Sequence, residues 1–98
     1  MHLKKEIYPH PNKWVRFLDN FLLVVAVFGP LVLIPQVLKV YTTQNVVGLS
    51  LFTWLFMTAG SVPWVIYGMV HKEKPIIIAY SLIFVFHALV LAGIFIYG

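Results

Sequence analysis

Three long stretches without charged side chains constrain this sequence more than any other feature. Residues 21–35 carry neither a charge nor an amide, residues 51–70 carry no charge, and residues 75–97 carry one imidazole, that of His87. About 20 apolar residues are enough for a helix to cross ~30 Å of hydrocarbon. Charged residues make up only 10% of the chain, whereas about a quarter is usual in a soluble domain. The pattern predicts an all-α, multi-pass integral membrane protein.

The charged residues gather at the ends of these stretches. We expect membrane spans at about residues 17–41, 51–70 and 75–97, preceded by a polar and aromatic segment at residues 1–16. Short loops make neighbouring helices antiparallel, so residues 17–98 are predicted to form a three-helix transmembrane bundle. The cations then act as anchors in the headgroup region of membrane lipid, which argues against nucleic acid as a partner. The charged residues are Lys4, Lys5, Glu6, Lys13, Arg16, Asp19, Lys39, Lys72, Glu73 and Lys74.

Local signals mark where the predicted helices begin. Asn12 is a suitable N-cap for a helix that begins at Lys13, and Ser50 is a suitable N-cap for the second span. Pro75 follows a tight charged turn, and proline is favoured in the first turn of a helix.

The end of the first span carries an unusual combination of a proline, an amide and a cation, within residues 33–39. Pro35 lacks a backbone N–H and therefore frees the carbonyl of Leu31. Lipid offers no hydrogen bond to that carbonyl or to the Gln36 amide, so we expect both to be satisfied by another part of the protein or by a watery cleft. Gly29 and Pro30 add a second break, and the first span is predicted to bend.

The second and third spans each have one face with polar or aromatic character. Gly60, Trp64 and Gly68 are spaced at four residues, so they share a helical face, and Tyr80 and His87 share a face of the third span. His87 permits two interpretations: a proton relay, or a neutral imidazole bonded across helices. The second is favoured because the three uncharged stretches contain no carboxylate to partner it.

No group of residues in this sequence suggests an enzyme. Asp19, Glu6 and Glu73 all lie outside the predicted membrane core, and no nucleophile is paired with a base. The absence of cysteine excludes thiolate chemistry. His71 and His87 are separated by about a whole span, so neither a metal site nor a cofactor is expected.

Four short motifs in a fixed order resemble those of a known family. They are Pro35-Gln36 at the end of the first span, Gly48-Leu49-Ser50, Trp64-Val65-Ile66-Tyr67-Gly68, and Pro75-Ile76-Ile77-Ile78-Ala79. This order and spacing is similar to the SemiSWEET proteins of the PQ-loop family, the bacterial half-size relatives of the SWEET sugar transporters. The resemblance covers roughly residues 21–97.

The resemblance implies a fold, an assembly and a function. The chain would be one repeat unit that pairs with a second copy as a parallel homodimer, with a central path for a small neutral solute such as a sugar. The implied location is the bacterial cell membrane. By position in the motifs, the resemblance assigns Trp64 and Tyr80 to substrate binding, Pro35 and Gln36 to a hinge, and Tyr67 and Glu73 to a gate.

Two positions depart from the family pattern. Tyr80 occupies the place of the family's pocket asparagine, and the often small and polar positions before Pro35 are Val32, Leu33 and Ile34. The pocket is therefore expected to be less polar than a standard sugar pocket, which leaves the substrate open. The alternatives are a PQ-loop transporter of another metabolite, such as an amino acid, and a membrane adaptor that transports nothing.

The charge pattern and the family resemblance predict opposite orientations in the membrane. The N-terminal segment and the second loop hold six of the seven Lys and Arg residues, and the positive-inside rule places such segments in the cytoplasm. The resemblance implies the reverse. We take the charge rule as the working expectation; activity of a cytoplasm-dependent reporter fused to the C-terminus would contradict it.

Overall fold

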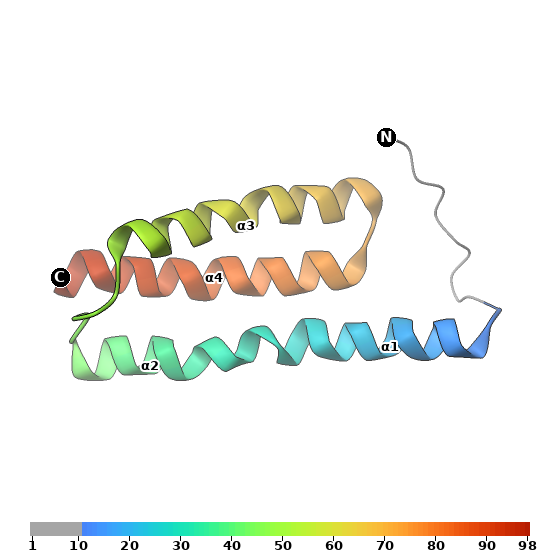
Figure 1. The fold of residues 1–98 in the computed structure, drawn as a ribbon, viewed down its shortest axis with the longest axis horizontal. Coiled ribbons are helices and arrows are strands. Elements are labelled where there is room, and N and C mark those ends of the chain that lie inside the picture. Colours follow the sequence, from blue (N-terminus) through green and yellow to red (C-terminus); the bar gives the residue numbers. More distant parts are fainter. Residues whose placement is uncertain (1–10) are drawn as a thin grey trace.

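The computed structural model describes residues 11–98, and all its regular elements are helical (Figure 1). The first rod consists of α1 (Lys13–Phe28), a 3₁₀ turn η1 (Pro30–Leu33) and α2 (Ile34–Thr43). It is followed by α3 (Leu51–His71) and α4 (Lys74–Tyr97). Three segments of 31, 21 and 24 residues are long and apolar enough to cross a membrane. The predicted all-α architecture with three spans is confirmed. The last residues of the predicted N-terminal segment are helical from Lys13 onward, and residues 1–10 lie outside the described part.

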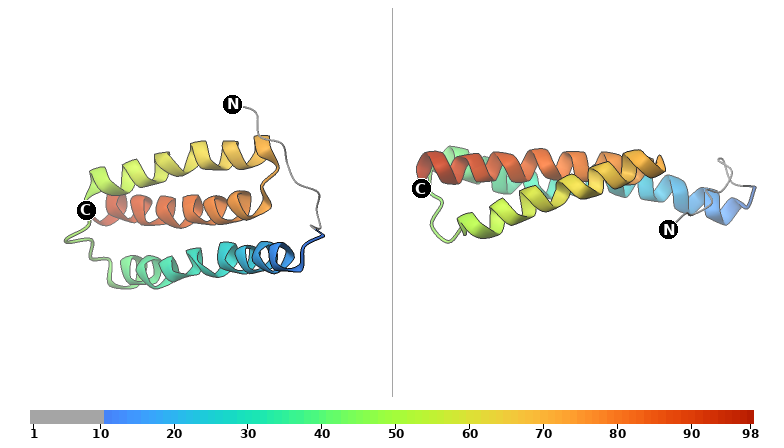
Figure 2. Two further views of the ribbon diagram at one scale, coloured as in Figure 1. Left: turned by 45° about the vertical axis from the view of Figure 1, so that its right-hand side comes forward. Right: turned by 90° about the horizontal axis from the view of Figure 1, so that it is seen from above.

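The three rods form a single layer with α4 in the middle. α4 packs against α3 on one side and against α1, η1 and α2 on the other, so it separates α3 from the first rod (Figure 2). The molecule measures 51 × 27 × 15 Å along its principal axes. A layer 15 Å thick is about the width of one helix with its side chains. Such a layer leaves broad apolar faces exposed and cannot surround a solute by itself.

The predicted N-caps are confirmed by their hydrogen bonds. The Asn12 side chain accepts from the Trp14 backbone N–H at 2.8 Å, and the Ser50 hydroxyl accepts from the Thr53 backbone N–H at 3.2 Å. The tight turn after α3 places Lys72 in the left-handed region (φ 55°), and the Glu73 N–H donates to the Gly68 carbonyl at 2.8 Å. This geometry ends α3 and starts α4 within two residues, which makes the two helices antiparallel neighbours.

The first rod is interrupted at Pro30–Leu33, before Pro35. Pro35 lies in the first turn of α2, where a backbone N–H has no intrahelical partner to lose. The expectation that another part of the protein satisfies the Leu31 carbonyl is wrong. In η1 the chain tightens to i→i+3 bonding, and the Ile34 N–H donates to that carbonyl locally. The interruption therefore satisfies the carbonyl that Pro35 frees.

The best-packed region lies where α2 crosses α4. Val40 and Val90 are fully buried there, together with Ile94. Gly93 allows this approach, because a Cβ at that position would overlap with Cγ1 of Val40. The Tyr41 hydroxyl donates to the Leu89 carbonyl at 2.7 Å and ties α2 to α4. These interactions hold α2 against α4, and we call this end of the bundle the fastened contact between α2 and α4.

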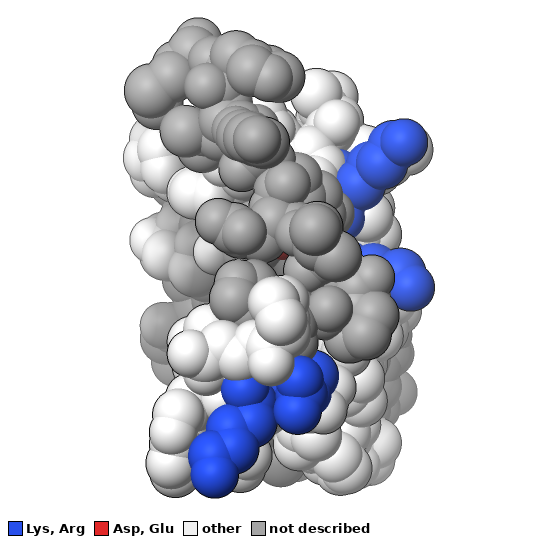
Figure 3. Space-filling model, turned by 90° about the vertical axis from the view of Figure 1, so that its right-hand side faces the viewer, with Lys and Arg blue, Asp and Glu red and all other residues white. Residues whose placement is uncertain are grey.

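The opposite end of the bundle is basic. Lys13 and Arg16 lie in the first turn of α1, Lys72 lies in the turn between α3 and α4, and Lys74 is the first residue of α4. Figure 3 looks onto this end and shows Lys and Arg side chains at its edges. The start of α1 and the α3–α4 turn therefore share one membrane boundary, as the antiparallel arrangement predicts.

Candidate functional site

Trp64 and Tyr80, the two residues predicted to bind substrate, are in contact. The indole of Trp64 on α3 stacks on the phenol of Tyr80 on α4, with ring centroids 5.4 Å apart and ring planes 15° apart. The tight turn sets this pairing, because it starts α4 next to the last part of α3. Trp64 remains 48% exposed in the single chain. The stack covers one face of each ring, and an aromatic face that stays open is of the kind that packs against the apolar face of a sugar ring.

A cavity of about 560 Å³ lies beside this pair, between α1–η1 and α4. The first rod lines it with aliphatic residues, proline and glycine, including Val32 and Leu33, and α4 contributes Tyr80, Ile83 and His87. Tyr80 therefore belongs to both the aromatic stack and the cavity wall, whereas Trp64 is not among the described residues that line the cavity. α1 and η1 both contact α4 beside this cavity, and α2 packs against α4 beyond it.

The cavity wall is almost entirely hydrocarbon. Among the described lining residues, only Tyr80 and His87 carry a polar side chain. Val32 and Leu33 lie in the wall, in agreement with the expectation of a weakly polar pocket. An apolar cavity with a few well-placed polar groups is the usual form of a small-molecule site.

His87 connects the cavity with α3. Its imidazole meets Trp54 edge to face, with centroids 5.3 Å apart and ring planes 87° apart. Nδ1 of His87 is buried and has no hydrogen-bond partner among the described residues. Nδ1 therefore does not make the predicted bond across the helices, but the backbone of Met57 on α3 lies within hydrogen-bonding reach of the imidazole. Sequence reasoning did not single out Trp54, since its spacing in α3 does not indicate which residue of α4 it meets.

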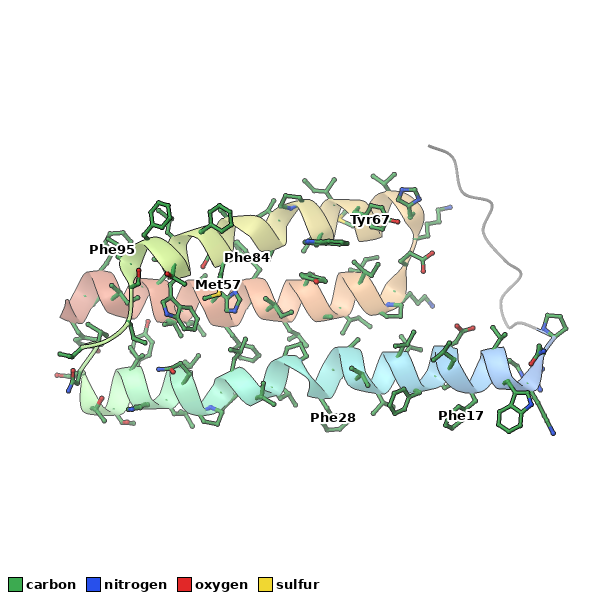
Figure 4. The ribbon with its side chains drawn as sticks, viewed as in Figure 1. Phe17, Phe28, Met57, Tyr67, Phe84 and Phe95 are labelled. Atoms are coloured by element: carbon green, nitrogen blue, oxygen red, sulfur yellow. The ribbon has the colours of Figure 1, made fainter. Side chains whose placement is uncertain are left out.

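The predicted gate residues lie toward the basic end. Tyr67 lies between the rings of Trp64, at 5.8 Å, and His71, at 4.4 Å. Figure 4 shows Tyr67 near the α3–α4 turn, where Glu73 precedes the first residue of α4. A row of aromatic rings therefore leads from Tyr80 toward the membrane boundary. The gating role of Tyr67 and Glu73 stays a prediction.

The predicted hinge residues lie just beyond the cavity. Pro35 is exposed and Gln36 is half-buried, and neither is among the described residues that line the cavity. The Gln36 amide makes no hydrogen bond within the described part of this single chain. Both residues directly follow the 3₁₀ interruption, so they lie where the first rod changes its path. Their role as a hinge stays a prediction.

The outer face of α3 is open in the single chain. A Cβ added at Gly60 would meet nothing within 4 Å, and Phe56 and Trp64 are exposed on the same helix. Gly68 differs, because it is buried against Ile76 and Ile77 of α4. The equal spacing of the small residues in α3 therefore does not make them equivalent. Gly60 lies on an open surface, whereas Gly68 lies at the contact between α3 and α4.

Comparisons with known proteins agree with this arrangement. The family model for the PQ loop repeat matches residues 18–77. A curated relative, the sugar transporter SemiSWEET of Vibrio sp. (strain N418), is 34% identical over 79 residues, covering 79% of this chain and 81% of the relative. The crystal structure of a bacterial homologue of SWEET transporters matches with a TM-score of 0.77 at 29% identity, covering 84% of this chain and 99% of that chain.

The sequence motifs, the three membrane-length helices and these matches lead to one assignment. The family is one of transporters, so the prediction that the chain is not an enzyme is confirmed. The chain belongs to the PQ-loop repeat family and, within it, to the SemiSWEET-type transporters of the membrane.

Proposed function

We propose that two copies of this chain pair in parallel and carry a small neutral solute, such as a sugar, across the membrane by facilitated alternating access. The observation that carries the proposal is the stacked Trp64–Tyr80 pair, half-exposed beside an apolar cavity in the middle of a membrane-spanning layer. A single layer about one helix thick cannot enclose a solute at this site. A second copy, related by an axis along the membrane normal, would close the site around a central path.

The residues have distinct roles in this proposal. The Trp64–Tyr80 surface packs against the apolar face of the solute, and the Tyr80 hydroxyl supplies one donor and two lone pairs. Residues 30–36 act as the hinge, with η1 as the bending element and Pro35 and Gln36 at the start of the stiff segment. Tyr67 and Glu73 form the gate at the basic end. The fastened contact between α2 and α4 supplies the fixed part against which α1 moves.

Flux through liposomes tests the proposal. The purified protein should equilibrate labelled sugars across the membrane without an ion gradient, and Trp64→Ala and Tyr80→Ala should each reduce that flux. Phe95→Ala is a matched control, because Phe95 is an exposed aromatic of α4 that lies at the far end of the bundle from Tyr67 (Figure 4). Wild-type flux in both site variants would refute the assignment of the pocket.

A solute panel distinguishes the alternatives. The curated relative is named a sugar transporter, and the apolar lining of this cavity favours the less polar members of such a panel. Flux of an amino acid and of no sugar would favour transport of another metabolite. A tightly packed interface between the two copies at Trp64, without a water-filled cavity and with no flux of any solute, would favour a membrane adaptor.

A further inference from the structure

His87 is the second polar side chain of the cavity wall, and the roles described above leave it unused. It follows Tyr80 by seven residues on α4. Seven residues are about two helical turns, so the two side chains share a face and lie about 10 Å apart along the helix axis. His87 lies on the side of Tyr80 that faces away from the basic end, toward the fastened contact between α2 and α4. The two polar groups therefore mark two successive levels of one cavity.

The position of the imidazole is set by α3. Trp54 meets the ring edge to face at 5.3 Å, and the backbone of Met57 approaches it from the same helix. Figure 4 shows Met57 on α3 in the region that faces α4. Nδ1 nevertheless has no hydrogen-bond partner among the described residues. A buried polar atom without a partner is costly, and such an atom usually indicates a water or ligand that supplies the missing bond.

The available partners limit what can pair with His87. The carboxylates of the described residues are Asp19, in the second turn of α1, and Glu73, in the α3–α4 turn, and both belong to the basic end. A proton relay through His87 would therefore lack a neighbouring carboxylate. A neutral imidazole has one donor and one acceptor nitrogen, which point to different sides of the ring. The backbone of Met57 lies within hydrogen-bonding reach of the ring, so Nδ1 is the nitrogen left for a hydroxyl group of the solute.

We propose that His87 forms a second hydrogen-bonding subsite for a neutral, hydroxyl-bearing solute, one level deeper in the cavity than Tyr80. The solute pairs first with Tyr80 and then with the imidazole, whose ring turns about χ2 on its Trp54 support. Nδ1 is buried in this arrangement, so a solute in the cavity reaches it only after the ring has turned. This subsite rests on the proposed transport function, and binding and flux test the two separately.

Two substitutions separate the hydrogen bond from packing. His87→Phe keeps a ring against Trp54 and removes both nitrogens, whereas His87→Asn loses the ring contact and keeps a donor and an acceptor. Equilibrium binding of labelled glucose and sucrose to the purified dimer is measured first, and liposome flux second. His87→Phe should weaken binding and raise KM about five- to tenfold with Vmax retained, as expected for one lost hydrogen bond. His87→Asn should restore most of the affinity.

Each outcome decides one of the two proposals. Weaker binding in His87→Phe supports the subsite even if no flux is seen, and missing flux then refutes transport alone. Flux with an unchanged KM in His87→Phe refutes the subsite and leaves transport standing. Wild-type protein that binds neither sugar refutes the subsite for this class of solute. Thermal unfolding of both variants shows whether either change acts through the fold.

Discussion

Replacing Gly93 with alanine should destabilise the contact between α2 and α4. Gly93 is buried, and a Cβ there would overlap with Cγ1 of Val40 and lie 3.7 Å from Cζ of Tyr41. Val40 has no exposed surface at all, so it has no space to move into. A β-branched residue in a helix also has one strongly preferred χ1 rotamer. The added methyl group therefore forces a shift of the backbone or a strained side chain.

The size of the effect follows from two opposing terms. Overpacking of a well-packed core costs about 1–3 kcal/mol. Alanine is a better helix former than glycine by up to about 1 kcal/mol. With the full gain in helix propensity, the difference between these terms is about 0–2 kcal/mol. Because the clash is with the fully buried Val40, we expect Gly93→Ala to lower the free energy of unfolding by an amount in the upper half of that range, about 1–2 kcal/mol.

Reversible unfolding of the monomer in mixed micelles measures this loss in the free energy of unfolding. Val40→Ala removes the methyl group that clashes, so Gly93→Ala should cost at least about 1 kcal/mol less in that background than in the wild type. Gly60→Ala is the matched control, because its new Cβ meets nothing within 4 Å. Equal destabilisation by Gly93→Ala in both backgrounds, or none in the wild type, would refute the argument from packing.

Two further predictions concern the first rod and its attachment. Pro30→Ala removes a buried ring from the cavity wall and from the contact of η1 with α4, so liposome flux should fall several-fold. Pro35→Ala should leave flux nearly unchanged, because Pro35 lies in the first turn of α2; a larger loss there than in Pro30→Ala would place the hinge at Pro35 instead. Tyr41→Phe loses the bond to the Leu89 carbonyl, and should lower the free energy of unfolding by about 0.5–1.5 kcal/mol in the same micelle assay. No change for Tyr41→Phe would mean that packing alone holds α2.

The features that were predictable from the sequence are those with local causes. An uncharged run of sufficient length has to cross the bilayer as a helix, because lipid leaves the backbone no other partner. Asn12 and Ser50 act as caps through bonds to residues two or three positions later, so their role depends only on neighbours in the chain. The tight turn before α4 has the same local origin.

The exact position of the break in the first span could not be predicted from neighbouring residues alone. The chain contains two breakers, Pro30 and Pro35, and a proline in any helix interior is expected to leave a carbonyl without its bond. The structure satisfies the carbonyl of Leu31 by tightening one turn into a 3₁₀ helix. The sequence left open which proline interrupts the helix and which one starts the next segment.

The candidate site also has features that were predictable from the sequence and features that were not. The resemblance of short motifs placed Trp64 and Tyr80 in the pocket, but motifs do not indicate that the two rings stack on each other. The Trp54–His87 and Tyr41–Leu89 contacts join residues 33 and 48 positions apart. No periodicity within one helix specifies such pairs, because they depend on how two helices cross.

The sequence by itself determined that this chain lies in a membrane as three helices, where each helix begins, and which transporter family it resembles, since these follow from hydropathy, caps and short motifs. The tertiary structure decided the rest. It placed α4 between its neighbours, held α2 tightly through Gly93 and Val40, and left a cavity beside Tyr80 and His87. The physical reason is that a cavity is the space left over after distant segments have packed, and that space depends on contacts between helices rather than on the character of any one of them.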